Sequence, residues 1–183
     1  MTSIQEYCAS TGRSLEASPP MAVAAQPLTW VDSPPWQRIE SPEPSAVIYV
    51  DPGAHRDGFS PNAVATCARV APAMSTDDAV AMIVATAEVL SDWTLVEEVA
   101  GEGDEDAGAV RSVYRFVRGT YTAEPGEMAT SSLIVGWSDD DATYVFQFVV
   151  TGWREDAGLH DSAMDCLLIG EWSAGQIVGA MKG

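Results

Sequence analysis

Three long strand-like segments, separated by short turn sequences, restrict the fold of this chain more than any other feature. They cover residues 109–121, 128–137 and 142–152, with EPGE and SDDDA between them. Connections this short join antiparallel neighbours, so the segments predict a three-stranded meander. Because side chains alternate between the two faces of a sheet, one face of the last strand gathers large apolar residues. These residues are Tyr144, Phe146, Phe148 and Val150.

Helical patterns lie on both sides of this meander. Ser3 and Glu6 form a capping-box pattern for a helix over residues 2–11, and Gly12 is placed to end it. The clearest helix covers residues 75–90, where Ser75 is the cap. Its expected buried stripe is Val80, Ile83, Val84, Ala87 and Leu90. A third helix is expected over residues 156–169, with Leu159, Ala163, Cys166 and Leu167 facing inward.

Shorter apolar segments predict further strands at AVIYV (46–50), NAVATCARV (62–70) and WTLVEEVA (93–100). Both faces of the second segment carry small, mostly apolar side chains, which indicates an interior strand covered on two sides. Cys67 lies in its middle, without a helix N-terminus beside it to lower the thiol pKa. We therefore expect a buried structural cysteine. The alternative is a nucleophile paired with a histidine, for which Arg69 on the same face is the one argument.

Residues 19–44 hold seven of the eleven prolines, yet they also carry Trp30 and Trp36. Linkers rarely contain tryptophan, so we interpret this segment as an extended cover over the core, with edge-strand pieces at 21–26 and 36–40.

Helices, strands and meander together predict an α+β fold with an antiparallel sheet. One domain is expected over residues 1–172, followed by a short, weakly helical tail at 173–183.

Charge and composition exclude several classes of protein. Nine basic residues stand against 27 acidic ones, a net charge of −18. Such a chain has too few cations to neutralise phosphates, so we expect neither nucleic-acid binding nor attraction to anionic membranes. No run approaches the roughly 20 apolar residues of a membrane helix. The N-terminus has no basic or apolar signal region, and Cys8 follows no hydrophobic stretch, so a cytoplasmic location is expected.

No motif in the chain identifies a reaction. His55 and His160 are the two histidines, and neither has a partner at metal-ligand spacing, so both are expected at the surface. GWSDD (136–140) leads into a hairpin rather than a helix, and GDEDAG and SDDDA lack the ligand spacing of a calcium loop. We expect no cofactor, no metal and no enzymatic activity.

Arginine and tryptophan supply the candidate binding residues. Arg111 and Arg115 share one face of the first meander strand, while Arg118 points the other way. Two cations in a strongly acidic chain indicate either an anion site or neutralisation of neighbouring acids. Trp30 and Trp36 of the proline-rich segment complete the candidate set.

The order of these pieces resembles the actinobacterial LpqN/LpqT lipoprotein family. The resemblance covers residues 2 to about 170 and includes TSIQEYCASTG, LTWVDSPPWQRI, AVIYVD and the F-x-P-N step at Phe59, Pro61 and Asn62. The helix TDDAVAMIVATAEVL, the G-T-Y at Gly119–Tyr121 and the strand TYVFQFVVTG also fit. This resemblance implies a PsbP-like fold, which is a curved antiparallel sheet with helices on both faces. It also implies an accessory or binding role without established catalytic residues. Family members usually carry an export signal and a lipid-anchored cysteine, so the cell envelope is the alternative location.

Three hypotheses about function follow. The first is a non-enzymatic binding or accessory protein that takes a protein partner or a small hydrophobic ligand. The alternative is a hydrolase or another enzyme whose site is not evident in the sequence, and the third is a structural part of a larger complex. The oligomeric state stays open.

Overall fold

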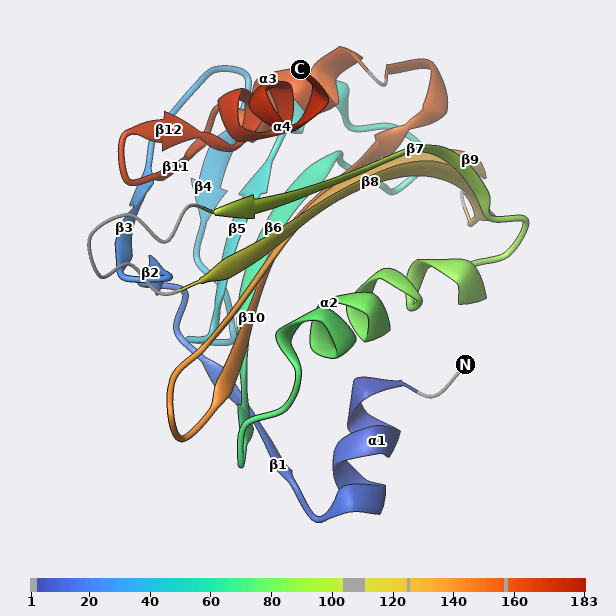
Figure 1. Cartoon of the computed structure of the whole chain (residues 1–183). Coiled ribbons are helices and arrows are strands. Elements are labelled where there is room, and N and C mark those ends of the chain that lie inside the picture. The colour runs from blue at the N-terminus through green and yellow to red at the C-terminus, as the bar shows by residue number, and fades with distance from the viewer. Residues whose placement is uncertain (1–2, 104–110, 125, 157) are drawn as a thin grey trace.

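The computed structural model describes residues 3–103, 111–124, 126–156 and 158–183. These residues form an eight-stranded antiparallel sheet in the order β4-β5-β6-β10-β9-β8-β7, with β1 pairing to β6 beyond the end of β5 (Figure 1). The long strands β8, β9 and β10 are the expected meander. The strands are β1 Ser14–Ser18, β4 Gln37–Ile39, β5 Ala46–Val50, β6 Asn62–Ala71, β7 Thr94–Gly103, β8 Ser112–Ala123, β9 Gly126–Ser138 and β10 Thr143–Trp153.

A second, smaller sheet has the order β12-β11-β3-β2. It brings the proline-rich segment together with the C-terminal part of the chain, because β3 pairs with β11. β2 and β3 form a tight hairpin in which Ala24 and Ala25 both have positive φ, at 46° and 69°. Its strands are β2 Ala22–Val23, β3 Gln26–Trp30, β11 Leu167–Ile169 and β12 Trp172–Ser173.

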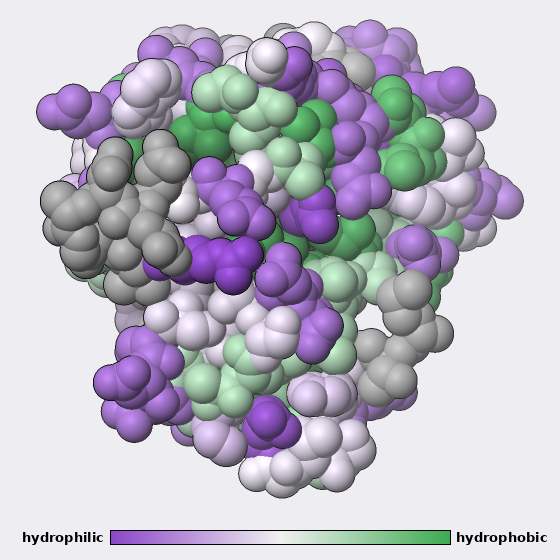
Figure 2. Space-filling view, viewed as in Figure 1, coloured by the Kyte–Doolittle hydropathy of each residue, from purple (hydrophilic) through white to green (hydrophobic). Residues whose placement is uncertain are grey.

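Helices cover both faces of the large sheet. α1 and α2 lie on one face, whereas α3, α4 and the small sheet lie on the other (Figure 1). The surface view in the same orientation shows apolar side chains gathered over α4 (Figure 2). The helices are α1 Ile4–Thr11, α2 Thr76–Val84, α3 Gly158–Met164 and α4 Ala174–Lys182, with short 3-10 turns η1 Pro52–Ala54, η2 Ala87–Val89 and η3 Arg154–Asp156.

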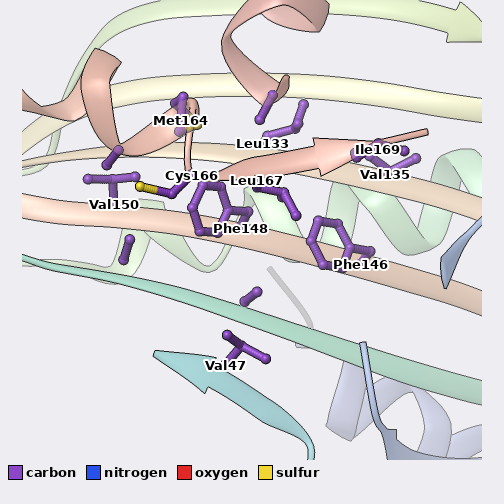
Figure 3. Packing of buried hydrophobic residues seen from close by; sticks show 14 of the residues in the cluster. Val47, Leu133, Val135, Phe146, Phe148, Val150, Met164, Cys166, Leu167 and Ile169 are labelled. Carbon is purple, nitrogen blue, oxygen red and sulfur yellow. The ribbon is translucent and has the colours of Figure 1, made fainter. Parts of the chain in front are cut away.

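The main core lies between the large sheet and the α3–β11 segment. Phe146 and Phe148 of β10 point toward Cys166 and Leu167, and all four side chains are buried (Figure 3). A second apolar cluster under α1 and α2 fills the other face. It consists of Ile4, Cys8, Val70, Met74, Ala79, Val80, Val113, Ile134 and Val145.

Most of the expected elements are confirmed. The capping box of Ser3 and Glu6 is formed, and Gly12 ends α1 in a left-handed conformation. The large apolar side chains of β10 lie on one face, where Phe146, Phe148 and Val150 are fully buried.

Two helix predictions are wrong in extent. The helix expected over residues 75–90 is α2, which ends at Val84. Thr86 then donates its hydroxyl to the Ile83 carbonyl, and the turn η2 follows. Of its expected stripe only Val80 is fully buried. The helix expected over residues 156–169 ends at Met164, because the next residues instead pair with β3 as strand β11.

Other differences concern strands. The expected piece at 21–26 is the β2–β3 hairpin, and β1 was not expected at all. β6 is fully covered on one face only, since Ala63, Ala65 and Cys67 are buried while Thr66 is exposed. The GDEDAG loop beyond Gly103, the first residues of the 109–121 segment and the side chain of Leu159 lie outside the described residues.

Candidate functional site

A groove of about 770 Å³ lies beside α4. Its walls come from the ends of β7 and β8, from the β11–β12 hairpin and from α4. Gln26 of β3 contributes from the small sheet. The groove therefore joins segments from all parts of the chain. Its larger apolar lining residues are Tyr114, Ile169, Trp172, Ile177 and Met181.

Backbone glycines shape one wall of this groove. A Cβ atom at Gly101 would lie 2.8 Å from Cγ of Met181, so the methionine rests directly on the β7 backbone. At Gly103 a Cβ atom would come 2.3 Å from the Ser112 hydroxyl oxygen. Any larger residue at these two positions would push side chains into the groove or away from it.

α4 forms the other wall because its sequence starts a well-capped amphipathic helix. The Ser173 hydroxyl accepts the Gln176 backbone N–H at 3.1 Å, and the Gln176 side chain accepts the Ser173 N–H at 2.8 Å. Val178 is buried against the core, and Ile177 and Met181 pack partly against it. The remaining surface of Ile177 and Met181 is available to the groove.

The polar groups of the groove are neutral or acidic. Gln26 and Ser112 are neutral, and Glu102 and Glu171 carry negative charge. Arg111 Nη2 lies 3.3 Å from Glu102 Oε1, and this exposed ion pair compensates one of the acids. Because its larger lining side chains are apolar and its described residues include no unpaired cation, the groove suits an uncharged ligand better than an anion.

The two candidate arginines lie in different surroundings. Arg111 precedes β8 and is exposed, whereas Arg115 is half-buried within β8. Arg115 faces the α2 side of the sheet, as do its strand neighbours Val113 and Val117. Glu98 and Glu102 of β7 stand opposite these two valines. Arg118 points to the other face and forms an ion pair with Asp161.

The two candidate tryptophans, Trp30 and Trp36, also lie in different surroundings. Trp30 is half-buried, packs against Tyr49 with ring centroids 6.0 Å apart, and lines a second groove of about 630 Å³ under the proline-rich segment. Trp36 is only 2% exposed and donates its indole N–H to the Ser162 hydroxyl at 3.1 Å. The structure therefore places none of the four candidate residues in the lining of the α4 groove. Arg111 forms an ion pair with Glu102, which does line the groove.

Cys67 is a buried residue of β6, as expected. It is 6% exposed and lies opposite Phe146 of β10. Burial raises the pKa of its thiol to about 11, so the nucleophilic thiolate is scarce near neutral pH. Cys8 and Cys166 are buried too, and burial also raises the pKa of each thiol.

The two histidines differ from one another. His55 lies on an exposed loop, where its Nδ1 is 2.8 Å from the Ser60 hydroxyl. His160 was expected at the surface, but it is 1% exposed, because α3 packs against β10 and places the imidazole beside Ser131 of β9. Its Nδ1 lies 3.4 Å from the Ser131 hydroxyl, which also accepts a hydrogen bond from Arg118 Nε at 3.0 Å. No hydrogen-bond partner of His160 Nε2 is found among the described residues.

Across the described parts of the chain, no group of histidine, cysteine, aspartate or glutamate residues is arranged to hold a metal ion. In the same residues, no helix combines the length and the apolar character needed to cross a membrane.

Comparison with protein-family models identifies the family of this chain. The family model described as "Probable lipoprotein LpqN" matches residues 1–171. The chain belongs to the LpqN family. A comparison with curated proteins finds no match.

One solved structure shares the fold of this chain. LpqN of Mycobacterium tuberculosis, described as involved in cell envelope biogenesis, superposes with a TM-score of 0.68 at 13% identity, covering 88% of this chain and 91% of that one. This likeness shows that the two chains share the α+β fold. The PsbP-like part of the expected fold stays a prediction.

Two other solved structures are less similar. A Pseudomonas aeruginosa protein of unknown function, PA94, gives a TM-score of 0.40 at 15% identity, covering 70% of this chain and 90% of that one. The Ran-binding protein Mog1p of Saccharomyces cerevisiae gives 0.39 at 12% identity, covering 92% and 93%. These TM-scores are too low to indicate a shared fold.

The α4 groove was missed in the sequence because one of its walls, α4, lies in the expected tail at 173–183. A signal was present, since Ser173 and Gln176 match the capping-box pattern and Ile177, Val178 and Met181 follow at helical spacing. The partners of α4 on β7 and β8 are distant in sequence, and no local pattern indicates them.

Proposed function

We propose that this LpqN-family chain is a non-enzymatic binding protein that takes a small, uncharged apolar ligand in the α4 groove. The observation that carries the proposal is the groove itself, a concave site of about 770 Å³ whose larger side chains are aromatic and aliphatic. Ligand sites are typically concave and mostly apolar, with a small number of polar groups that orient the ligand. Trp172 is 57% exposed at its edge, which is a large apolar surface for a ligand to cover.

Binding rather than catalysis is supported by the surroundings of the histidines. Acid–base catalysis needs a proton carrier that a substrate can reach, oriented by a further group. His160 is enclosed in the core, and the described residues provide no carboxylate hydrogen bond to His55.

The proposal places this function in the cell envelope. Support comes from the family description, which is that of a probable lipoprotein, and from the description of LpqN of M. tuberculosis as involved in cell envelope biogenesis. Fractionation of the native cells with an antibody to the chain tests the location. Recovery in the envelope fraction is expected, and recovery in the cytosol alone would contradict it.

A protein partner is the second candidate. Exposed apolar side chains support it, because Leu95 and Val96 lie on β7, the strand at one edge of the large sheet, and Val89 is exposed on η2. Cross-linking in native cells would detect such a partner, and loss of the cross-link in a Val96→Asp variant would place it on this edge.

A fluorescence titration tests the groove. N-phenyl-1-naphthylamine is an uncharged dye that brightens in apolar surroundings, and we expect it to bind at one saturable site. Trp172→Ala should weaken its binding by about tenfold, a typical effect of removing a large aromatic contact. Val89→Ala is the matched control, since Val89 is exposed but lies outside the groove. Equal affinities of the two variants would place the dye elsewhere and contradict the proposal.

A further inference from the structure

A second cavity lies on the opposite face of the large sheet, between that sheet and the segment formed by α2 and η2. Its volume is about 210 Å³, and its lining comes from Ile83 to Trp93 on one side and from β8, β9 and β10 on the other. None of its residues lines the α4 groove. A ligand of this cavity would therefore be separate from the ligand proposed for the α4 groove.

Trp93 lines this cavity, and Gly119 of β8 leaves the space in which the Trp93 ring lies. A Cβ atom at Gly119 would come within 2.2 Å of the Trp93 ring, so only glycine allows the indole to lie directly across β8. Gly119 begins the G-T-Y sequence noted above, and Tyr121 at its end also lines the cavity. The G-T-Y sequence thus supplies both the space for an aromatic wall and a phenolic hydroxyl.

The polar atoms of the cavity are uncharged, and most of them are already engaged. Thr130 donates its hydroxyl to the Val150 carbonyl at 3.1 Å, and Gln147 donates its side-chain N–H to the Ser132 hydroxyl at 3.1 Å. For the Tyr121 hydroxyl, the described residues provide no hydrogen-bond partner, and burial raises its pKa. The hydroxyl is therefore protonated near neutral pH and can donate a hydrogen bond.

We propose that this cavity binds an uncharged molecule of about the size of one aromatic ring, with a hydrogen-bond acceptor directed at the Tyr121 hydroxyl. Size supports the proposal, because an apolar cavity of about 150 Å³ in another protein is known to bind benzene. Its aromatic wall at Trp93 and its aliphatic wall at Ile83, Val84 and Leu90 suit a ring. A charged ligand is disfavoured, since no lining residue carries a charge to compensate it.

Three probes of similar shape test the proposal by NMR titration of the isotope-labelled full chain. Acetophenone carries a carbonyl acceptor, ethylbenzene has none, and benzoate is an anion. We expect acetophenone and ethylbenzene to shift the Trp93 indole and Gln147 side-chain signals in a saturable way. Benzoate should leave them unchanged. Absence of saturable shifts at these residues, shifts confined to Trp172 and Ile177, or equal binding of benzoate would overturn the proposal.

Two variants assign the roles of the residues. Tyr121→Phe removes only the hydroxyl, and it should weaken acetophenone by about fivefold while ethylbenzene stays within twofold. Equal weakening of both probes would refute the proposed hydrogen bond. Gly119→Ala should displace Trp93 and abolish binding of both probes, with circular dichroism as the check that the chain is folded. Trp172→Ala in the α4 groove is the control and should change neither affinity.

Discussion

The indole nitrogen of Trp36 donates a hydrogen bond to the hydroxyl of Ser162, at 3.1 Å, and so joins the proline-rich segment to α3 across 126 positions of sequence. The indole itself is 2% exposed and belongs to the main core. This segment is therefore part of the folded domain, and the tryptophan is one of the residues that attach it.

Trp36→Phe should lower the free energy of unfolding by about 1–3 kcal/mol, because it removes a buried hydrogen bond and part of a buried side chain. Chemical denaturation measures this change. Trp172→Phe is the matched control and should change stability by less than about 0.5 kcal/mol, since Trp172 is mostly exposed. Equal effects of the two substitutions would show that the segment is not held through Trp36.

His160 should make stability depend on pH. Burial and the nearby Arg118 guanidinium lower the pKa of His160 to about 4, from 6.5 in the unfolded chain, although Asp161 and Asp156 oppose the shift. Between these values the unfolded chain binds a proton that the folded chain does not, so stability falls as pH decreases from 6.5 to 4. The loss from this residue should reach about 3 kcal/mol.

Urea denaturation at pH 7 and pH 4 measures this dependence as a difference between the wild type and His160→Gln. The variant should lose less stability between the two pH values, because it cannot bind the proton. His55→Gln is the control and should behave as the wild type, since His55 is exposed. Identical pH dependence of His160→Gln and wild type would rule out His160 as the source.

The three thiols should react slowly with DTNB in native buffer at pH 8 and completely in denaturant, because Cys8, Cys67 and Cys166 are all buried. For Cys67, whose thiol pKa is raised to about 11, the reactive thiolate is scarce at this pH. Cys67→Ser should cost about 1–3 kcal/mol as a polar replacement in an apolar site. Fast labelling of one thiol per chain, lost in Cys67→Ser, would contradict its burial.

Two glycine substitutions should act in opposite directions. A Cβ atom at Gly136 would lie 2.6 Å from Val80 and 2.7 Å from Thr76, so Gly136→Ala should separate α2 from β9 and cost about 1–3 kcal/mol. Gly179 lies within α4 with no atom within 4 Å of the added methyl group, so Gly179→Ala should stabilise by about 0.5–1 kcal/mol. Thermal denaturation measures both, and a destabilised Gly179→Ala variant would show that the α4 backbone is not as described.

The sequence predicted the parts of the fold that depend on local signals. The β8–β10 meander follows from strand alternation and short turns, and α1 follows from Ser3, Glu6 and Gly12. Elements that depend on distant partners were missed or misread. β1 is defined by pairing with β6, and β11 by pairing with β3, so Leu167 and Ile169 look helical in isolation.

Dependence on partners distant in sequence also explains why the candidate site was not predicted. Arg111, Arg115, Trp30 and Trp36 were selected by residue type, and a single strand or segment cannot show which side chains meet in space. The α4 groove needs β7, β8, β11, β12 and α4 together. Only the capping box at Ser173 and the apolar spacing of α4 could have indicated its wall in advance.

A crystal structure of the chain grown with N-phenyl-1-naphthylamine would show whether the α4 groove holds an uncharged apolar ligand. We expect ordered density for the dye between Trp172, Ile177 and Met181, in contact with Tyr114. Density for the dye in the groove beside Trp30, or an empty α4 groove in crystals grown at saturating dye, would contradict it.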